Sequence, residues 1–137
     1  MTTIVVTAAV IEDVKDIEGI EHGGRLLVTR RQQGVHLEGY WEFPGGKCHP
    51  GEPLETCLAR ELREELAVEV TIGTEILATT HAYPDLLVEL HFFRCGLLGT
   101  PVPQIGQEMR WVTREELGGL PFPPADTELI HLLTRQA

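Results

Sequence analysis

The chain has 137 residues, a formal net charge of −10 and 42% hydrophobic residues. This length allows one domain with a hydrophobic core and is too short for two ordinary domains, so residues 1–137 are expected to form one domain. The acidic charge argues against binding of nucleic acid polymers, because clustered Lys and Arg bind phosphate backbones. No segment has the apolar length of a membrane span, and Met1-Thr2-Thr3-Ile4 lacks a signal-peptide layout, so a cytoplasmic protein is expected.

The cysteines predict neither a disulfide framework nor a zinc knuckle. Cys48, Cys57 and Cys95 are odd in number and show no CxxC spacing. Cys57 and Cys95 are expected to pack in the core, and Cys48 is expected in an exposed loop without a catalytic role.

The first half of the chain predicts two strands and a helix. Apolar β-branched residues at 4–11 predict a strand buried on both faces, and residues 25–31 predict a second strand. The intervening segment 12–24 is rich in acids and glycine and is expected to be a loop. Further along, loop residues 32–40 and a turn at Pro44-Gly45-Gly46 are expected.

A helix is expected to begin after Gly51-Glu52-Pro53, because proline is tolerated in the first helical turn. From there, leucines repeat every four residues, at 54, 58, 62 and 66, and predict one packed face.

The second half predicts further strands and two short helices. The expected strands are 68–72, 75–83, 86–95 and 109–113, with a turn at Pro84-Asp85 and a loop at 96–106. Thr113 is expected to cap a helix at 114–117, and an amphipathic helix is expected at 127–135. This order predicts an α/β fold with a mixed sheet flanked by helices.

Three glutamates share one face of the helix that begins near residue 54. At about 100° per residue, Glu61, Glu64 and Glu65 lie within about one turn. Like charges at this spacing destabilise a helix by about 0.2–0.5 kcal/mol per pair and raise carboxylate pKa values. A hard divalent cation would remove the repulsion, and carboxylate oxygens suit Mg²⁺ or Mn²⁺ better than zinc. The alternative is a solvated face with Arg60 and Arg63 as counter-charges.

Residues 46–68, GKCHPGEPLETCLARELREELAV, resemble the signature of the Nudix hydrolases. The matching positions are Gly46, Glu52, Arg60, Glu61, Leu62, Glu64, Glu65 and Val68. Ala67 stands where the signature has glycine, which predicts about 1 kcal/mol of strain in a left-handed conformation or a different helix end. The resemblance implies the Nudix fold, an α/β/α sandwich around a mixed sheet, with Glu52 bracing the loop before the helix.

The Nudix resemblance also implies chemistry, namely metal-dependent hydrolysis of a nucleoside diphosphate linked to another group. The cofactor would be Mg²⁺, with Mn²⁺ as a substitute. Carried over by position, Glu64 and Glu65 are metal ligands, and Glu61 is a further ligand or the base. The backbone carbonyl of Gly45 would join the metal site, and Arg60 would orient Glu61 through a charge-assisted hydrogen bond.

Residues 28–31, 41–47 and 122–126 resemble the MutT branch of this family, which cleaves nucleoside triphosphates to monophosphate and pyrophosphate. The branch includes 8-oxo-dGTP diphosphatases and CTP pyrophosphohydrolases. The resemblance implies substrate binding by Arg30, Arg31, Phe43, Lys47 and Asp126. For the three cations the alternative is ordinary surface charge.

Three positions depart from the MutT pattern and weaken a strict 8-oxo-dGTP assignment. Asp126 replaces the asparagine of the 8-oxo-dGTP specialist and Leu86 replaces an arginine. An ionised aspartate only accepts hydrogen bonds, so it would favour the N4 amino group of cytosine or the N1/N2 edge of guanine. A helix N-cap is the alternative role for Asp126, and both roles can hold together. Ile105 occupies the position of a further acid, for which Glu108 is the nearest substitute.

The leading expectation is therefore a Mg²⁺-dependent pyrophosphohydrolase of (deoxy)nucleoside triphosphates, with the sanitising of oxidised nucleotides such as 8-oxo-dGTP as one role. One alternative is a Nudix hydrolase of ADP-ribose or a dinucleoside polyphosphate. Another is a non-catalytic nucleotide-binding Nudix module, which the presence of all three glutamates disfavours. The sequence leaves both a monomer and a homodimer open.

Overall fold

Strands come before and after a first long helix, and shorter helices follow the last strand, in a computed structural model that describes residues 2–13, 24–35 and 37–135. Most of the expected loop 12–24 lies outside these residues. The strands are β1 Thr2–Asp13, β2 Arg25–Arg30, β3 Trp41–Glu42, β4 Gly45–Lys47, β5 Val70–Tyr83, β6 Leu86–Leu97 and β7 Met109–Val112. The helices are α1 Leu54–Leu66, α2 Arg114–Leu117, the 3-10 helix η1 Pro124–Asp126 and α3 Thr127–Thr134.

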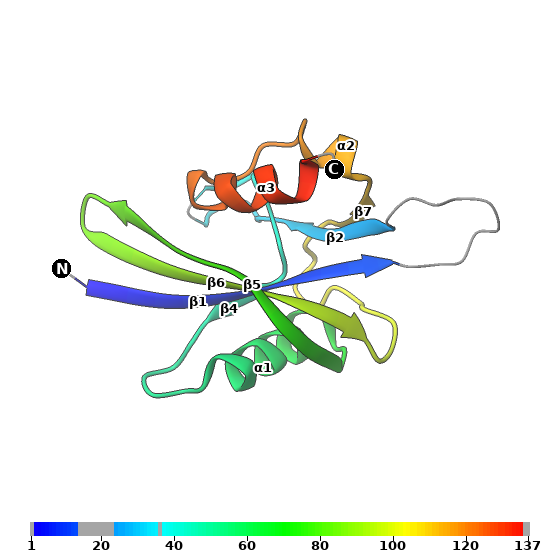
Figure 1. Ribbon diagram of the computed structural model, residues 1–137. Coiled ribbons are helices and arrows are strands. Elements are labelled where there is room, and N and C mark those ends of the chain that lie inside the picture. The colour runs from blue at the N-terminus through cyan, green and yellow to red at the C-terminus, as the bar shows by residue number, and fades with distance from the viewer. Residues whose placement is uncertain (1, 14–23, 36, 136–137) are drawn as a thin grey trace.

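The strands form one mixed sheet in the order β3-β2-β1-β6-β5, with β4 paired to β1 and β7 paired to β2. Strands β1 and β6 are parallel, from Thr2 opposite Leu86 to Ile11 opposite Cys95, and the other pairs are antiparallel. Figure 1 shows α1 on one side of the sheet and α3 on the other. The predicted α/β fold with a mixed sheet is confirmed.

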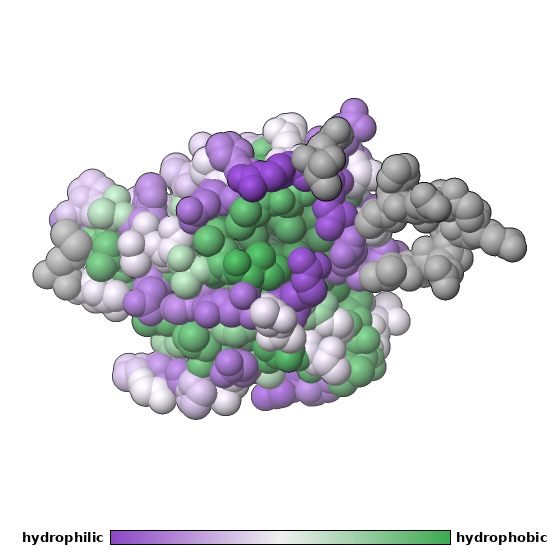
Figure 2. Space-filling view, in the orientation of Figure 1, coloured by the Kyte–Doolittle hydropathy of each residue, from purple (hydrophilic) through white to green (hydrophobic). Residues whose placement is uncertain are grey.

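The central strand β1 separates two hydrophobic cores. Ala8 and Val10 belong to the core shared with α2 and α3, whereas Ala9 and Ile11 belong to the core under α1. Alternate side chains of a strand point to opposite faces, so the apolar run of β1, interrupted by the buried Thr7, reflects burial on both sides, as predicted. On the face shown in Figure 2, hydrophobic side chains gather between the α3 layer and the sheet.

The turn predicted at Pro44-Gly45-Gly46 is confined to a bend at Pro44, because residues 45–47 form β4. Gly45 pairs with Ala8 and Gly46 pairs with Thr7 of β1. A Cβ atom on Gly45 would lie 2.0 Å from the Thr7 carbonyl oxygen, so only glycine allows this approach. The glycines mark a close backbone contact rather than a change of direction.

The two strands expected at 68–72 and 75–83 are one strand, β5. Its pairing with β6 shifts register between Ile72 and Glu75 and again between Glu75 and Leu77. Such irregularities let the strand continue through Gly73, where a strand end was expected.

Helix α1 follows the sequence pattern closely. Cys57, Leu58, Leu62 and Leu66 are buried, which confirms the packed face. Ala67 adopts the left-handed conformation, with φ 49° and ψ 41°, and its N–H donates to the Arg63 carbonyl at 3.0 Å. The chain therefore keeps the helix end that glycine normally supplies and accepts the backbone strain.

The expected cap of α2 is also present. Thr113 Oγ1 accepts a hydrogen bond from the Glu116 N–H at 3.0 Å, and the Glu116 carboxylate accepts from the Thr113 N–H at 3.1 Å. Within the described ranges, no helix combines the length and apolar character needed to cross a membrane.

Candidate active site

Arg60 of α1 joins the acidic residues of the helix to the loop before it. Its guanidinium donates to both carboxylate oxygens of Glu52, at 2.8 and 2.9 Å, and to the Lys47 carbonyl at 3.1 Å. The same group donates to Glu61 at 3.0 Å and to Glu64 at 3.2 Å. Through Glu52, Arg60 thus fixes the loop against the helix, which is the bracing role expected for Glu52. Arg60 also holds Glu61 and Glu64, two of the three glutamates.

The contacts of Arg60 separate the carboxylates by pKa. The hydrogen bonds from Arg60 lower the pKa of Glu52 to about 2. Burial raises the pKa of Glu61, although Arg60 opposes the shift. Burial also raises the pKa of Glu65 to about 8, and the charges of Glu42, Glu61 and Glu64 add to this effect. The side chains of the protein therefore do not fully neutralise the negative charge of Glu61 and Glu65.

Strand β4 contacts Glu61 and Glu65 through the backbone of its two glycines. A Cβ atom on Gly46 would lie 2.3 Å from the Glu61 carboxyl carbon, so the carboxylate rests directly on the backbone of β4. Gly45 hydrogen-bonds through its backbone to Glu65. Glycines 45 and 46 therefore allow both the pairing with β1 and the close placement of the acids.

Glu61, Glu65 and Gly45 line one wall of a cavity of about 770 Å³ between the sheet, η1 and the β5–β6 turn. Its other lining residues include Arg31, Glu42, Phe43, Lys47, Tyr83, Leu86, Phe92 and Asp126. Glu64 is not among the lining residues, and its side chain is 58% exposed on the outer side of Arg60. The volume is within the range of small-molecule sites, about 300–1,000 Å³.

The donor set of this wall fits a hard divalent cation. Glu61 and Glu65 offer carboxylate oxygens and Gly45 offers a backbone carbonyl, with Glu64 one residue away on the exposed side. Mg²⁺ and Mn²⁺ prefer oxygen ligands of this kind. A bound cation would also reverse the electrostatic conditions that raise the pKa of Glu61 and Glu65.

The far end of the cavity is largely apolar. Phe43 is 4% exposed, stacks against Phe122 with ring centroids 5.4 Å apart, and meets the edge of Phe92 at 6.1 Å. Asp126 at the end of η1 is 7% exposed. A flat, apolar ligand that also carries hydrogen-bonding groups suits this end.

Asp126 differs from the sequence-based expectation in two respects. It occupies the N-cap position of α3, as expected, but its side chain makes no capping hydrogen bond. Burial raises its pKa to about 7, the nearby charge of Glu42 adds to this, and Arg31 opposes it. The carboxyl therefore keeps its proton to a higher pH than an ordinary aspartate does, and the protonated form can donate as well as accept hydrogen bonds.

The predicted substrate-binding cations occupy different places. Arg31 and Lys47 line the main cavity, and Arg31 donates to Glu42 at 2.7 Å. Arg30 lies outside it, where it donates to the Gly39 carbonyl at 3.1 Å and pairs with Glu108 at 3.4 Å. The structure brings Arg31 and Lys47 to the acidic wall but does not bring Arg30 there.

Glu42 is a site residue that sequence reasoning missed. It lines the cavity, pairs with Arg31, and has a pKa that burial raises. Its position between Trp41 and Phe43, within the segment that resembles MutT proteins, was the available signal.

The loop before β7 brings an amide rather than an acid toward Glu65. Ile105 is 57% exposed, and Glu108 pairs with Arg30 and Arg110 at the surface, so the suggested substitution by Glu108 is wrong. Gln107 is buried, and its side-chain amide donates to the Glu65 carbonyl at 3.1 Å. Gln107 and Ile105 line a smaller pocket of about 170 Å³ that also reaches Glu65.

Comparison with known proteins assigns the family. Residues 19–132 match the family model described as the NUDIX domain. The CTP pyrophosphohydrolase of Escherichia coli K12 is 34% identical over 112 residues, which cover 81% of this chain and 83% of that protein. The 8-oxo-dGTP diphosphatase of Haemophilus influenzae is 35% identical over 115 residues, which cover 82% and 84%. The solution structure of the E. coli ORF135 protein has a TM-score of 0.78 and 34% identity, and covers 97% of this chain and 87% of that one.

The chain therefore belongs to the Nudix family and is a MutT-like Nudix hydrolase, an enzyme that acts on phosphoric anhydride bonds. The predicted resemblance and the predicted enzyme class are both confirmed.

Proposed function

We propose that this enzyme is a Mg²⁺-dependent (deoxy)nucleoside triphosphate pyrophosphohydrolase that releases a nucleoside monophosphate and pyrophosphate. One observation carries the proposal. The oxygen-rich wall of Glu61, Glu65 and Gly45 and the apolar end at Phe43 and Asp126 belong to the same cavity. A polyphosphate and a base on one molecule match these two ends.

Magnesium would be held by Glu61, Glu64, Glu65 and the Gly45 carbonyl. When bound, it would supply positive charge to phosphoryl oxygens and a water of lowered pKa. Arg60 acts on this chemistry as a positioning residue, because it fixes the carboxylates of Glu61 and Glu64 within 3.0 and 3.2 Å of its guanidinium.

Cations of the chain support binding of the phosphates. Lys47 follows the glycines of β4 at the edge of the cavity, and Arg31 faces it from beyond the end of β2. A positive charge near the acidic wall attracts a polyphosphate only when the carboxylates are neutralised, so phosphate binding should depend on the cation.

Phe43 and Asp126 would receive the base. Phe43, which already stacks on Phe122, would contribute apolar wall to the base end of the cavity, and the partly protonated Asp126 would provide a donor and an acceptor. A protonated carboxyl presents the same pair of functions as the asparagine amide that it replaces in the 8-oxo-dGTP specialist. The range of acceptable bases is therefore wider than an ionised aspartate would allow.

The deciding experiment is a substrate panel with and without Mg²⁺. We expect pyrophosphate release from nucleoside triphosphates, and kcat/KM for 8-oxo-dGTP, dGTP, CTP and dCTP identifies the preferred base. Release of AMP from ADP-ribose without pyrophosphate from triphosphates would show a different Nudix substrate class. Binding of triphosphates with no turnover in Mg²⁺ or Mn²⁺ would contradict the proposal.

Two further expectations complete the proposal. The two cores pack against one sheet, which supports the prediction that residues 1–137 act as one domain. A cytoplasmic location remains a prediction from the sequence.

A further inference from the structure

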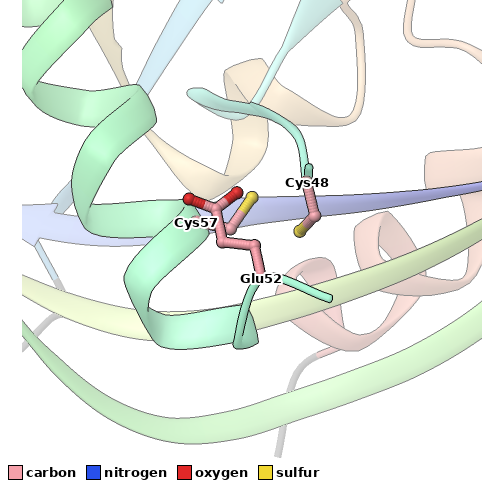
Figure 3. A group of neighbouring side chains, drawn as sticks. All are labelled: Cys48, Glu52 and Cys57. Atoms are coloured by element: carbon pink, nitrogen blue, oxygen red, sulfur yellow. The ribbon is translucent and has the colours of Figure 1, made fainter. Parts of the chain in front are cut away.

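A pair of sulfur atoms and a carboxylate converge beside the acidic wall. The Sγ atoms of Cys48 and Cys57 and a carboxylate oxygen of Glu52 all lie within 4.8 Å of one another. Figure 3 shows the three side chains meeting where the loop after β4 passes the first turn of α1. None of the roles proposed above for metal or nucleotide uses either cysteine.

The two thiols differ in access but share a rigid setting. Cys57 is fully buried, lies 3.3 Å from the Thr7 hydroxyl, and contacts the Gly46 carbonyl at 3.8 Å. Cys48 is partly exposed, and its backbone N–H donates to the Val5 carbonyl at 2.9 Å. A solute can therefore reach the cluster from the side of Cys48 without moving the helix.

Glu52 enters this cluster already fixed. Arg60 holds both of its oxygens, and the His49 N–H donates to one of them at 2.9 Å. A carboxylate has about four lone-pair sites, so these hydrogen bonds leave room for one more positive partner.

The electrostatics of the cluster disfavour oxidation of Cys48. Burial, the neighbouring Cys57 and the charge of Glu52 together raise the pKa of the Cys48 thiol to about 12. A thiol with so high a pKa is a poor nucleophile, which makes peroxide oxidation slow. A thiophilic metal ion has to displace the thiol proton, and its charge offsets this cost by neutralising the adjacent carboxylate.

We propose that Cys48, Cys57 and Glu52 form a binding site for a thiophilic divalent cation of the zinc class. Two sulfur ligands and one oxygen ligand leave a fourth, water-accessible position in a tetrahedral site. The oxygen wall of Glu61 and Glu65 selects a hard cation, whereas the sulfur pair selects a soft one. Arg60 lies between the two sites, since it contacts Glu52 on one side and Glu61 on the other.

The test measures metal binding to the reduced protein in the presence of excess Mg²⁺ and without nucleotide, so its outcome is independent of the proposed turnover. Zn²⁺ is followed by equilibrium dialysis, and Cd²⁺ is followed by thiolate-to-metal charge-transfer absorption. We expect one equivalent of either metal and a thiolate absorption band in the wild-type protein.

Substitutions assign the ligands. Loss of an outer-shell partner alone costs metal sites about 10- to 100-fold in affinity, so Cys48→Ser should weaken Zn²⁺ and Cd²⁺ binding at least about tenfold. Cys95→Ser is the matched control, because Cys95 is buried on β6, its thiol contacts the Phe93 carbonyl, and it lies outside the cluster. Its affinity and absorption band should equal those of the wild-type protein.

Cys57→Ser alters a fully buried position and can unfold the protein. The deciding variant is therefore Cys48→Ser, at the partly exposed position, and its melting temperature is measured to show that it is folded. Equal metal affinity in the wild-type protein and Cys48→Ser would overturn the proposal. The absence of a thiolate-to-metal charge-transfer band would also overturn the proposal. So would a protein that forms a Cys48–Cys57 disulfide and binds no metal after the disulfide is reduced.

Discussion

At the α1 end of the cavity an arginine holds the carboxylates, whereas at the η1 end the surrounding side chains exclude water from them. Arg60 lowers the pKa of Glu52 to about 2, and burial raises that of Asp126 to about 7. The ionised carboxylate at the α1 end is the loop brace Glu52, which does not line the cavity, whereas burial raises the pKa of the cavity-lining Glu65 to about 8 as well. A bound cation would favour the ionised form of Glu65, whereas Asp126 can use its proton to donate a hydrogen bond to a base.

The largest expected effect is loss of a glutamate at the α1 end. Glu64→Gln and Glu65→Gln should each reduce kcat at least about 100-fold while leaving folding nearly intact, in the range typical of a removed catalytic group. Steady-state pyrophosphate release measures the effect. Glu55→Gln, an exposed position on the same helix, should retain full activity. Little change in kcat for Glu64→Gln would show that its ligand assignment is wrong.

Arg60→Lys tests whether the α1 end depends on the geometry of the guanidinium. Lysine keeps the charge but cannot donate to both oxygens of Glu52 and to Glu61 at once. We expect the Mg²⁺ concentration for half-maximal activity to rise about 10- to 100-fold, as for other groups that orient metal ligands. Arg63→Lys is the control, because Arg63 forms an exposed pair with Glu69 at 3.4 Å. Equal Mg²⁺ dependence in the two variants would argue that charge alone suffices.

Asp126→Asn tests the role of burial at the η1 end. Because the folded-state pKa is raised from 3.8 to about 7, the protonated form is favoured on folding. This contribution is complete below the unfolded-state pKa and is lost as pH rises toward and through the folded-state value. At about 1.4 kcal/mol per unit, the variant should be more stable than the wild-type protein by about 1–4 kcal/mol at pH 8, and by less at pH 5.

Urea denaturation at the two pH values measures this difference. Asp85→Asn makes the same chemical change at an exposed turn and should show no such pH dependence. If the difference in unfolding free energy between Asp126→Asn and the wild-type protein does not grow with pH, water reaches the Asp126 carboxyl in the folded protein.

The smallest expected effect concerns the end of α1. Ala67→Gly should increase stability by about 0.5–1 kcal/mol, because glycine adopts the observed φ of 49° without strain. Ala59→Gly, within the same helix, should decrease stability by a similar amount. Both are read from thermal melts. A loss of stability in Ala67→Gly would show that Ala67 carries no strain, and a change in turnover would show that the acidic wall depends on this helix end.

The local features of α1 could be predicted from the sequence because they depend on spacing along one helix. The leucine repeat and the closeness of Glu61 and Glu65 follow from helix geometry, whereas for Ala67 the sequence left open a strained left-handed end or a different end, and the left-handed one is observed. The strand at residues 45–47 could not be predicted, because glycine disfavours strands and the cause is the close approach of Gly45 to Thr7. The continuity of β5 depends on its pairing with β6, which spacing alone does not show.

In the candidate site, the sequence indicated charge and residue type but not environment. The ionised state of Asp126 was assumed from its residue type alone, whereas burial raises the pKa of its carboxyl and the charge of Glu42, which is distant in sequence, adds to this shift. The convergence of Cys48 and Cys57 was missed because their spacing matches no metal motif, although helix α1 returns beside β4. Gln107 reaches Glu65 through a loop whose shape no pattern predicted.

Gly46 and Gly51 should respond differently to random mutagenesis, for different physical reasons. A Cβ atom at Gly46 would push aside the Glu61 carboxylate, the flexible end of a side chain, so other residues there should keep the fold but be depleted in a selection for activity. Gly51 has open space around it and a φ of +75°, which asparagine and aspartate also adopt, so these two should survive. Deep sequencing of selected libraries would thus distinguish a glycine required for space from a glycine required for backbone angle.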